Sequence, residues 1–177
     1  MKTSAIKTLT FAACLLVSGS ASAFNTLSFD GRNSLVWRSV DRPVEYEIEQ
    51  GFPALSNGVD IIIDSHDSWV DVTCSSISFS YQGDTTGNQI FQRDGINKVV
   101  FTTAGFSTTN AGALGVTYTE FSADGNGWFI SGGDIAINGY SEWSSSGQSD
   151  RFDLEGTVTH EVGHMIGIQH TPVAAAT

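Results

Sequence analysis

Residues 160–170 read His160-Glu161-Val162-Gly163-His164-Met165-Ile166-Gly167-Ile168-Gln169-His170, which is the pattern H-E-x-x-H-x-x-G-x-x-H. Positions i and i+4 of a helix lie on one face, so His160 and His164 can present two imidazoles to a single ion. Gly167 predicts the end of this helix, because glycine enters left-handed backbone conformations at no steric cost. The chain can then turn and bring His170 round as a third ligand.

Three neutral imidazole nitrogens with an open fourth position are typical of a catalytic zinc site, whereas a structural site is closed by a fourth protein ligand. Glu161 follows the first histidine, so its carboxylate can reach a water on the ion without becoming a ligand. We therefore predict Zn²⁺ as the cofactor and Glu161 as the general base for attack on a carbonyl. The alternative is that these histidines are ordinary core residues, in which case the spacing of the whole motif is a coincidence.

At these residues the sequence resembles the metzincin metallopeptidases, and within them the matrixins of the secreted bacterial type. Thr171 follows the third histidine, as Ser or Thr does in matrixins, and residues 152–159 lead into the motif as the family's active-site helix does. Residues 132–138, followed by Glu142-Trp143, are similar to the family segment G-G-D-A-H-F-D…E-W. The resemblance covers roughly residues 35–171.

The pattern of apolar residues predicts a single α/β or α+β domain, occupying residues 24–177. Strands are expected at residues 44–49, 77–81, 97–101, 114–119 and 133–138, loops at 83–88 and 103–112, and helices over 54–72 and through the histidine motif. The resemblance implies a twisted, mostly parallel five-stranded sheet with one antiparallel edge strand and two long helices.

The resemblance also implies how substrate is held. An extended protein or peptide substrate would add to the edge strand by backbone pairing, as in other β-augmentation modes. The matching segment runs from about Leu114 to Thr119, so Leu114, Gly115, Val116 and Thr117 are the expected substrate-binding residues.

The first 23 residues predict a secretory signal peptide. Lys2 and Lys7 precede an apolar run, and Ala21-Ser22-Ala23 is an A-x-A cleavage site, so the mature chain would begin near Phe24 and be secreted or periplasmic. The apolar run is too short to span a bilayer. A lipoprotein site at Cys14 is the alternative, but the apolar run continues beyond it.

The charge composition limits the kinds of molecule that this chain can bind. The net charge of −11 over 177 residues becomes more negative when the two leader lysines are removed, so the surface would repel nucleic acid and anionic membranes. We expect a monomer with no nucleic-acid partner and, after leader cleavage, no membrane partner. Cys74 is then the one cysteine left; it is either a buried thiol or a thiol whose partner lies outside this chain.

The sequence offers two further candidate metal sites. Calcium is a candidate because hard oxygen ligands occur at Asp124, Asn126, Asp134 and Asn138, although the same residues are ordinary in turns. His66 lies among Asp64, Asp67 and Asp71, where a solvated helix face explains the pattern as well as a metal does.

Two departures of the sequence from the family concern the structural zinc and the methionine turn. Animal matrixins carry a structural zinc held by three histidines and an aspartate, but this chain has four histidines and three belong to the motif. Thr119 and Ala136 stand roughly where two of those ligands would be. Metzincins also place a methionine turn soon after the third histidine, and residues 171–177 contain no methionine. We therefore expect a chain truncated before that turn, with the C-terminal subdomain largely missing.

The sequence thus predicts a secreted zinc-dependent endopeptidase with His160, His164 and His170 as ligands. One alternative is a truncated, catalytically weak or inactive remnant that binds peptide without cutting it. Another is a secreted calcium-binding surface protein in which the motif is accidental.

Overall fold

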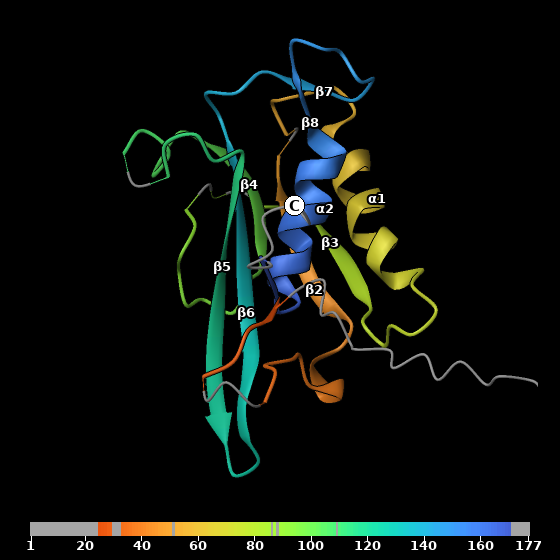
Figure 1. The fold of residues 1–177 in the computed structure, drawn as a ribbon, viewed down its shortest axis with the longest axis vertical. Helices are drawn as coiled ribbons and strands as arrows, with labels where there is room; N and C mark the ends of the chain where they lie inside the picture. The colour runs from red at the N-terminus through yellow and green to blue at the C-terminus, as the bar shows by residue number, and fades with distance from the viewer. Residues whose placement is uncertain are drawn as a thin grey trace, which may run out of the picture.

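The computed structural model describes residues 25–29, 33–50, 52–85, 87, 89–108 and 110–170. Its main sheet is built from β2 (Val44–Glu49), β3 (Phe79–Thr85), β4 (Lys98–Thr102), β5 (Gly115–Asp124) and β6 (Gly127–Asn138). The strand order is β3-β2-β4-β6-β5 (Figure 1). Neighbours run parallel except β5, which pairs antiparallel with β6 at the edge. The predicted five-stranded, mostly parallel sheet with an antiparallel edge strand is confirmed.

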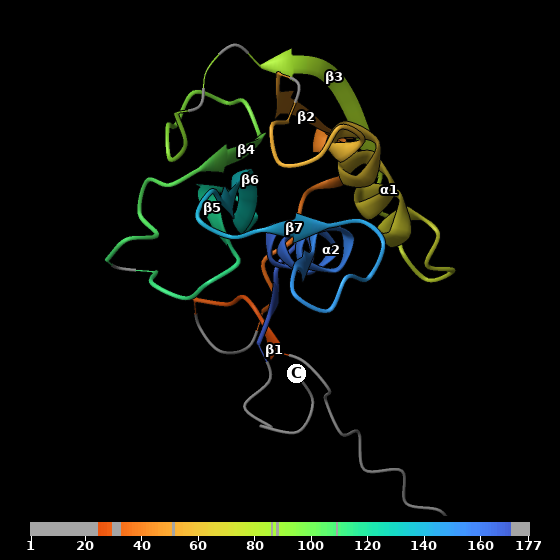
Figure 2. The same cartoon turned by 90° about the horizontal axis from the view of Figure 1, so that it is seen from above.

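Two helices cover one face of this sheet: α1 (Gly58–Val70) and α2 (Leu154–Met165) (Figure 2). Loops between β3 and β5 cover part of the opposite face, where Ile90 and Phe106 pack with Val100 and Ala136. A 3₁₀ turn, η1 (Ser39–Asp41), precedes β2. Two short pairs complete the fold, β1 (Asn25–Thr26) with β9 (Ile168–Gln169) and β7 (Trp143–Ser144) with β8 (Phe152–Asp153).

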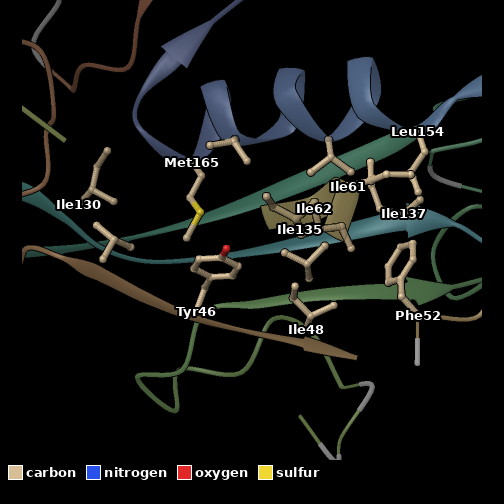
Figure 3. Close-up of a cluster of buried hydrophobic side chains, with 14 of the residues drawn as sticks. Tyr46, Ile48, Phe52, Ile61, Ile62, Ile130, Ile135, Ile137, Leu154 and Met165 are labelled. Atoms are coloured by element: carbon tan, nitrogen blue, oxygen red, sulfur yellow. The ribbon is translucent and has the colours of Figure 1, made fainter. Parts of the chain in front are cut away.

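The main core lies between the helices and the sheet. Figure 3 shows Leu154 and Met165 of α2 pointing toward side chains of the strands. Leu154, Ile48 and Ile137 are all fully buried, with no exposed surface. The alternating pattern of β2 explains its place: Val44, Tyr46 and Ile48 are buried and the residues between them are more exposed. Burial of each such side chain contributes roughly 1.5–3 kcal/mol.

Hydrogen bonds fix the position of α2. The indole of Trp69 on α1 donates to the carbonyl of Thr159 at 2.9 Å, and the indole of Trp37 donates to the carbonyl of Met165 at 3.0 Å. The second bond satisfies a carbonyl in the last turn, which has no partner within the helix. The middle and the end of the helix are therefore both tied to the rest of the fold.

Several predicted boundaries were wrong. The segment 83–88 was expected to be a loop, but β3 continues through Thr85 because its backbone keeps pairing with β2. The strands predicted at 114–119 and 133–138 are the inner halves of a longer hairpin. Its two strands stay paired from Gly115 as far as Asp124, where the chain turns. α1 is shorter at both ends than the predicted span of 54–72.

The reading of His66 as part of a solvated face was also wrong. Its imidazole is fully buried and stacks on the Tyr46 ring, with centroids 3.9 Å apart and planes 4° apart. The neighbouring Asp64, Asp67 and Asp71 are exposed, so the four side chains do not share a face that could bind a metal.

Candidate metal centre

Helix α2 places the first two histidines as the motif predicts. His160 and His164 lie one turn apart near its C-terminal end, and their ring centroids are 4.7 Å apart. The helix ends at Met165. Gly167 then adopts φ +98°, a left-handed conformation that residues with a Cβ rarely adopt. A Cβ at Gly167 would also lie 2.7 Å from the carbonyl oxygen of Leu35. The turn predicted at this glycine is therefore present, and it brings His170 back to the helix.

The three imidazoles converge on one point. His170 Nε2 lies 2.9 Å from His160 Nε2 and 3.0 Å from His164 Nε2. Zinc–nitrogen bonds of about 2.0–2.1 Å in a tetrahedral site put ligand nitrogens roughly 3.3 Å apart, so a small outward movement would fit an ion. Within the described residues, these histidines form the one group of three or more His, Cys, Asp or Glu side chains that could hold a metal.

The hydrogen bond of His164 fits this role. Its Nδ1 lies 2.7 Å from the carbonyl oxygen of Ile168, which can only accept, so Nδ1 carries the proton. The lone pair of Nε2 is then free to bind a metal, as in other sites where the second ring nitrogen donates to a carbonyl. The donor set and its protonation therefore suit zinc.

The N-terminal strand holds the segment that carries His170. β1 pairs antiparallel with β9, and Leu27 N donates to Gly167 O at 2.8 Å. The Asn25 side chain donates to the carbonyl of His170 at 3.3 Å. Nothing in the sequence signalled this pairing, because the paired residues lie more than 140 positions apart and each strand is two residues long.

Glu161 points into the space between α2 and β5. Thr117 Oγ1 lies 2.7 Å from Glu161 Oε2 and 2.9 Å from the Glu161 carbonyl oxygen, so its single proton is shared between the two acceptors. Gly115 provides the room: a Cβ there would lie 2.7 Å from Glu161 Cγ and 2.8 Å from Oε1. Thr117 and Gly115 were predicted as substrate-binding residues, and their contact with Glu161 was missed.

Burial shifts the pKa values of Glu161 and His160. It raises the pKa of the Glu161 carboxyl, and the Thr117 hydrogen bond opposes this by stabilising the carboxylate. Burial also lowers the pKa of His160, and repulsion by the charged forms of His164 and His170 adds to the effect. The raised pKa makes the Glu161 carboxylate a stronger base, and the lowered pKa favours the neutral imidazole at His160.

One cleft of about 740 Å³ joins these groups, which is in the usual range for ligand pockets. One wall comes from α2 and its continuation and the other from the edge strand and the residues before it. The cleft is lined by all three histidines and Glu161, by the expected substrate-binding residues Leu114, Gly115, Val116 and Thr117, and by Ala113, Thr119, Asp153, Gly156, Thr157 and Gln169.

The four candidate calcium residues do not come together. Asp124 pairs with Gly127 at the tip of the hairpin, and Asp134 lies seven residues further along β6, roughly 23 Å away at strand spacing. Both Asp134 oxygens accept backbone N–H groups, from Phe91 and Lys98. The structure therefore gives calcium no support.

Cys74 is exposed rather than buried.

The fold and the three converging imidazoles together define a class, the zinc metallopeptidases. The model of the matrixin family of peptidases matches residues 4–177. The chain belongs to the matrixin family, and a matrixin is a zinc metallopeptidase that acts on protein or peptide substrates. Among curated proteins no match was found. Within the described residues, no helix is long and apolar enough to cross a membrane.

Proposed function

We propose that this chain is a secreted endopeptidase that cuts extended segments of protein at a single zinc ion. One observation carries the proposal: the three converging imidazoles, the Glu161 carboxylate and the free edge of β5 line the same cleft. His160, His164 and His170 would hold the ion. When bound, zinc supplies a Lewis acid for the scissile carbonyl and lowers the pKa of a water to about 7.

The edge strand would position the peptide. Asn138 N donates to Leu114 O at 2.9 Å, so the backbone groups of Leu114 point toward β6. Because these directions alternate along a strand, the N–H and C=O of Gly115 and Thr117 point toward the free edge. A peptide laid along this edge can pair with them, and its scissile carbonyl then lies beside Glu161.

Glu161 would move the proton. Thr117 engages Oε2, which leaves Oε1 to accept a proton from the attacking water. The carboxyl then returns this proton to the nitrogen of the leaving amine. The buried position raises the pKa of the carboxyl toward the working range of such a base, which makes proton uptake from the water easier.

The test is Glu161→Gln, assayed on denatured casein with zinc content measured in parallel. We expect normal zinc content and a loss of activity of several orders of magnitude, because general base catalysis and water orientation are both removed. Glu155→Gln is the matched control, since Glu155 is exposed on the same helix. A Glu161→Gln protein that cuts casein at the parent rate would refute the mechanism. Casein binding without cleavage by the parent would favour the peptide-binding remnant.

We also propose export through a signal peptide in residues 1–23, which lie outside the described residues. The residues that support it are the basic start, the apolar run and Ala21-Ser22-Ala23. N-terminal sequencing of protein recovered outside the cells should begin at Phe24. An N-terminus that still includes Lys2 would contradict export by this route.

A further inference from the structure

Three aromatic side chains gather at the outer half of the β5–β6 hairpin. The Phe29 ring contacts those of Phe121 and Trp128 edge to face, with centroid distances of 5.1 Å and 4.9 Å. Phe29 is 59% exposed and Trp128 58% exposed. We call these three residues the aromatic platform. Phe121 is partly buried and packs against the main core. Exposed aromatic side chains that lie together commonly mark a binding surface.

The platform lies on the same face of the sheet as the candidate metal centre. Thr117 points its side chain at Glu161, so every second residue from it along β5 faces the same way. Thr119 follows and lines the cleft, and Phe121 comes next. Trp128 pairs with Ala123, and paired residues share a face, so Trp128 lies one step further out. At strand spacing, Phe121 lies roughly 13 Å from Thr117.

Among the strands that the structure describes, none pairs with the outer edge of β5 near the cleft, and at the platform this edge is occupied. The outward-pointing backbone groups belong to Gly115, Thr117, Thr119 and Phe121, by the alternation described above. The carbonyl of Phe121 already accepts a hydrogen bond from Arg93 Nη2 at 3.3 Å. A peptide can therefore pair with the strand as far as Thr119. Beyond that point the platform offers side-chain contacts in place of backbone pairing.

We propose that the aromatic platform is a distal specificity subsite, which holds an apolar or aromatic side chain of the same extended peptide. The continuity of β5 from the cleft to Phe121 argues for this occupant, because a peptide paired along the edge leads to the platform. The contacted side chain would lie about four to six residues from the scissile bond. The inference rests on the proposed endopeptidase function.

The experiment begins with one mapped cleavage site in denatured casein. A short peptide carries three residues on each side of the scissile bond, and two long peptides extend either the N-terminal or the C-terminal side to eight residues. Each extension is made with phenylalanine or alanine at the fourth to sixth positions. We expect one phenylalanine extension, and not its alanine counterpart, to lower KM about tenfold with kcat unchanged, as burial of one aromatic anchor commonly does.

Trp128→Ala should remove the lower KM of the phenylalanine extension and leave cleavage of the short peptide unchanged. Trp128→Phe should largely restore the lower KM. Tyr140→Ala is the matched control, because Tyr140 is 65% exposed and outside both the platform and the cleft lining. Equal KM values for phenylalanine and alanine extensions would overturn the subsite. So would a wild-type dimer abolished by Trp128→Ala, since the platform would then be a self-association surface. Failure to cut even the short peptide would count against the proposed function itself.

Discussion

Gly115 matters because of the side chain it lacks. Its α-carbon faces Glu161 so closely that an added Cβ would lie 2.7 Å from Cγ, well inside van der Waals contact. Gly115→Ala should therefore push the carboxylate aside by about 1 Å and reduce kcat/KM roughly 100-fold. Zinc content should stay normal, since the three atoms nearest to the new methyl group all belong to Glu161. Casein hydrolysis and metal analysis on the same preparation measure both quantities.

Gly125→Ala is the control for this substitution. Gly125 lies in the turn of the same hairpin, and a Cβ there would meet nothing within 4 Å. It should keep parental activity. If Gly115→Ala is equally active, Glu161 is not held where the structure places it.

His66 lies where helical spacing places it and not where its acidic neighbours suggested. Three acidic neighbours favoured a solvated position, but helical spacing puts His66 on the buried side, against Tyr46 and edge-to-face with Phe79. Its Nδ1 lies 2.7 Å from the carbonyl oxygen of Ile62, and its buried Nε2 has no hydrogen-bond partner among the described residues. Stacking of this kind depends on which strand lies under the helix, and that information is not local to the helix sequence.

Burial lowers the pKa of His66 to about 4, so the folded state strongly favours the neutral ring. The unfolded chain takes up the proton near pH 6.5, hence stability is fully present above that pH and falls as pH drops toward 4. The loss should reach roughly 3 kcal/mol at pH 4. Urea unfolding of the parent and of His66→Phe at several pH values measures it. The variant should lack this component of the pH dependence; parallel curves would refute the assignment.

At the scale of elements, strands in which buried and exposed residues alternate could be predicted, but the lengths of hairpins could not. Val44–Glu49 has buried residues at every second position, and its predicted bounds are confirmed. The outer half of β5 contains Glu120, Ser122 and Asp124, whose polarity suggested an end to the strand. These side chains point away from the helix face, so polarity there costs nothing. The pairing continues because β6 supplies the partner backbone.

The pairing of β1 with β9 leads to a prediction about the third ligand. Removing Asn25 and Thr26 deletes the strand that aligns Ile168 and Gln169, together with the donor to the His170 carbonyl. Zinc affinity should fall about tenfold, as it does when groups that orient a ligand are lost. Competition with a chromogenic chelator measures it. Asn25→Ala keeps the backbone pairing and should lose less. Unchanged affinity in the shortened chain would mean that His170 is held by other contacts.

At the scale of the molecule, the convergence of the three histidines was predictable because all three lie within eleven residues, where helix geometry and one glycine decide their arrangement. The partners of Glu161 come from elsewhere: Thr117 is 44 residues away and is placed by the antiparallel return of β5 along β6. The family resemblance supplied this edge strand in advance. Residue patterns alone gave the strand but not its neighbour, because sheet order is a property of the whole chain.

Zinc should also stabilise the whole domain, because it would tie the end of α2 to the segment after Gly167. A ligand that binds only the folded state, at a free concentration 1,000 times its Kd, adds about 4 kcal/mol. Chelation should accordingly lower Tm by roughly 10 °C, and added zinc should restore it. His170→Asn, at an exposed position, should show no zinc-dependent shift while melting like the chelated parent. If both proteins respond equally to zinc, the stabilising ion is bound somewhere other than these three histidines.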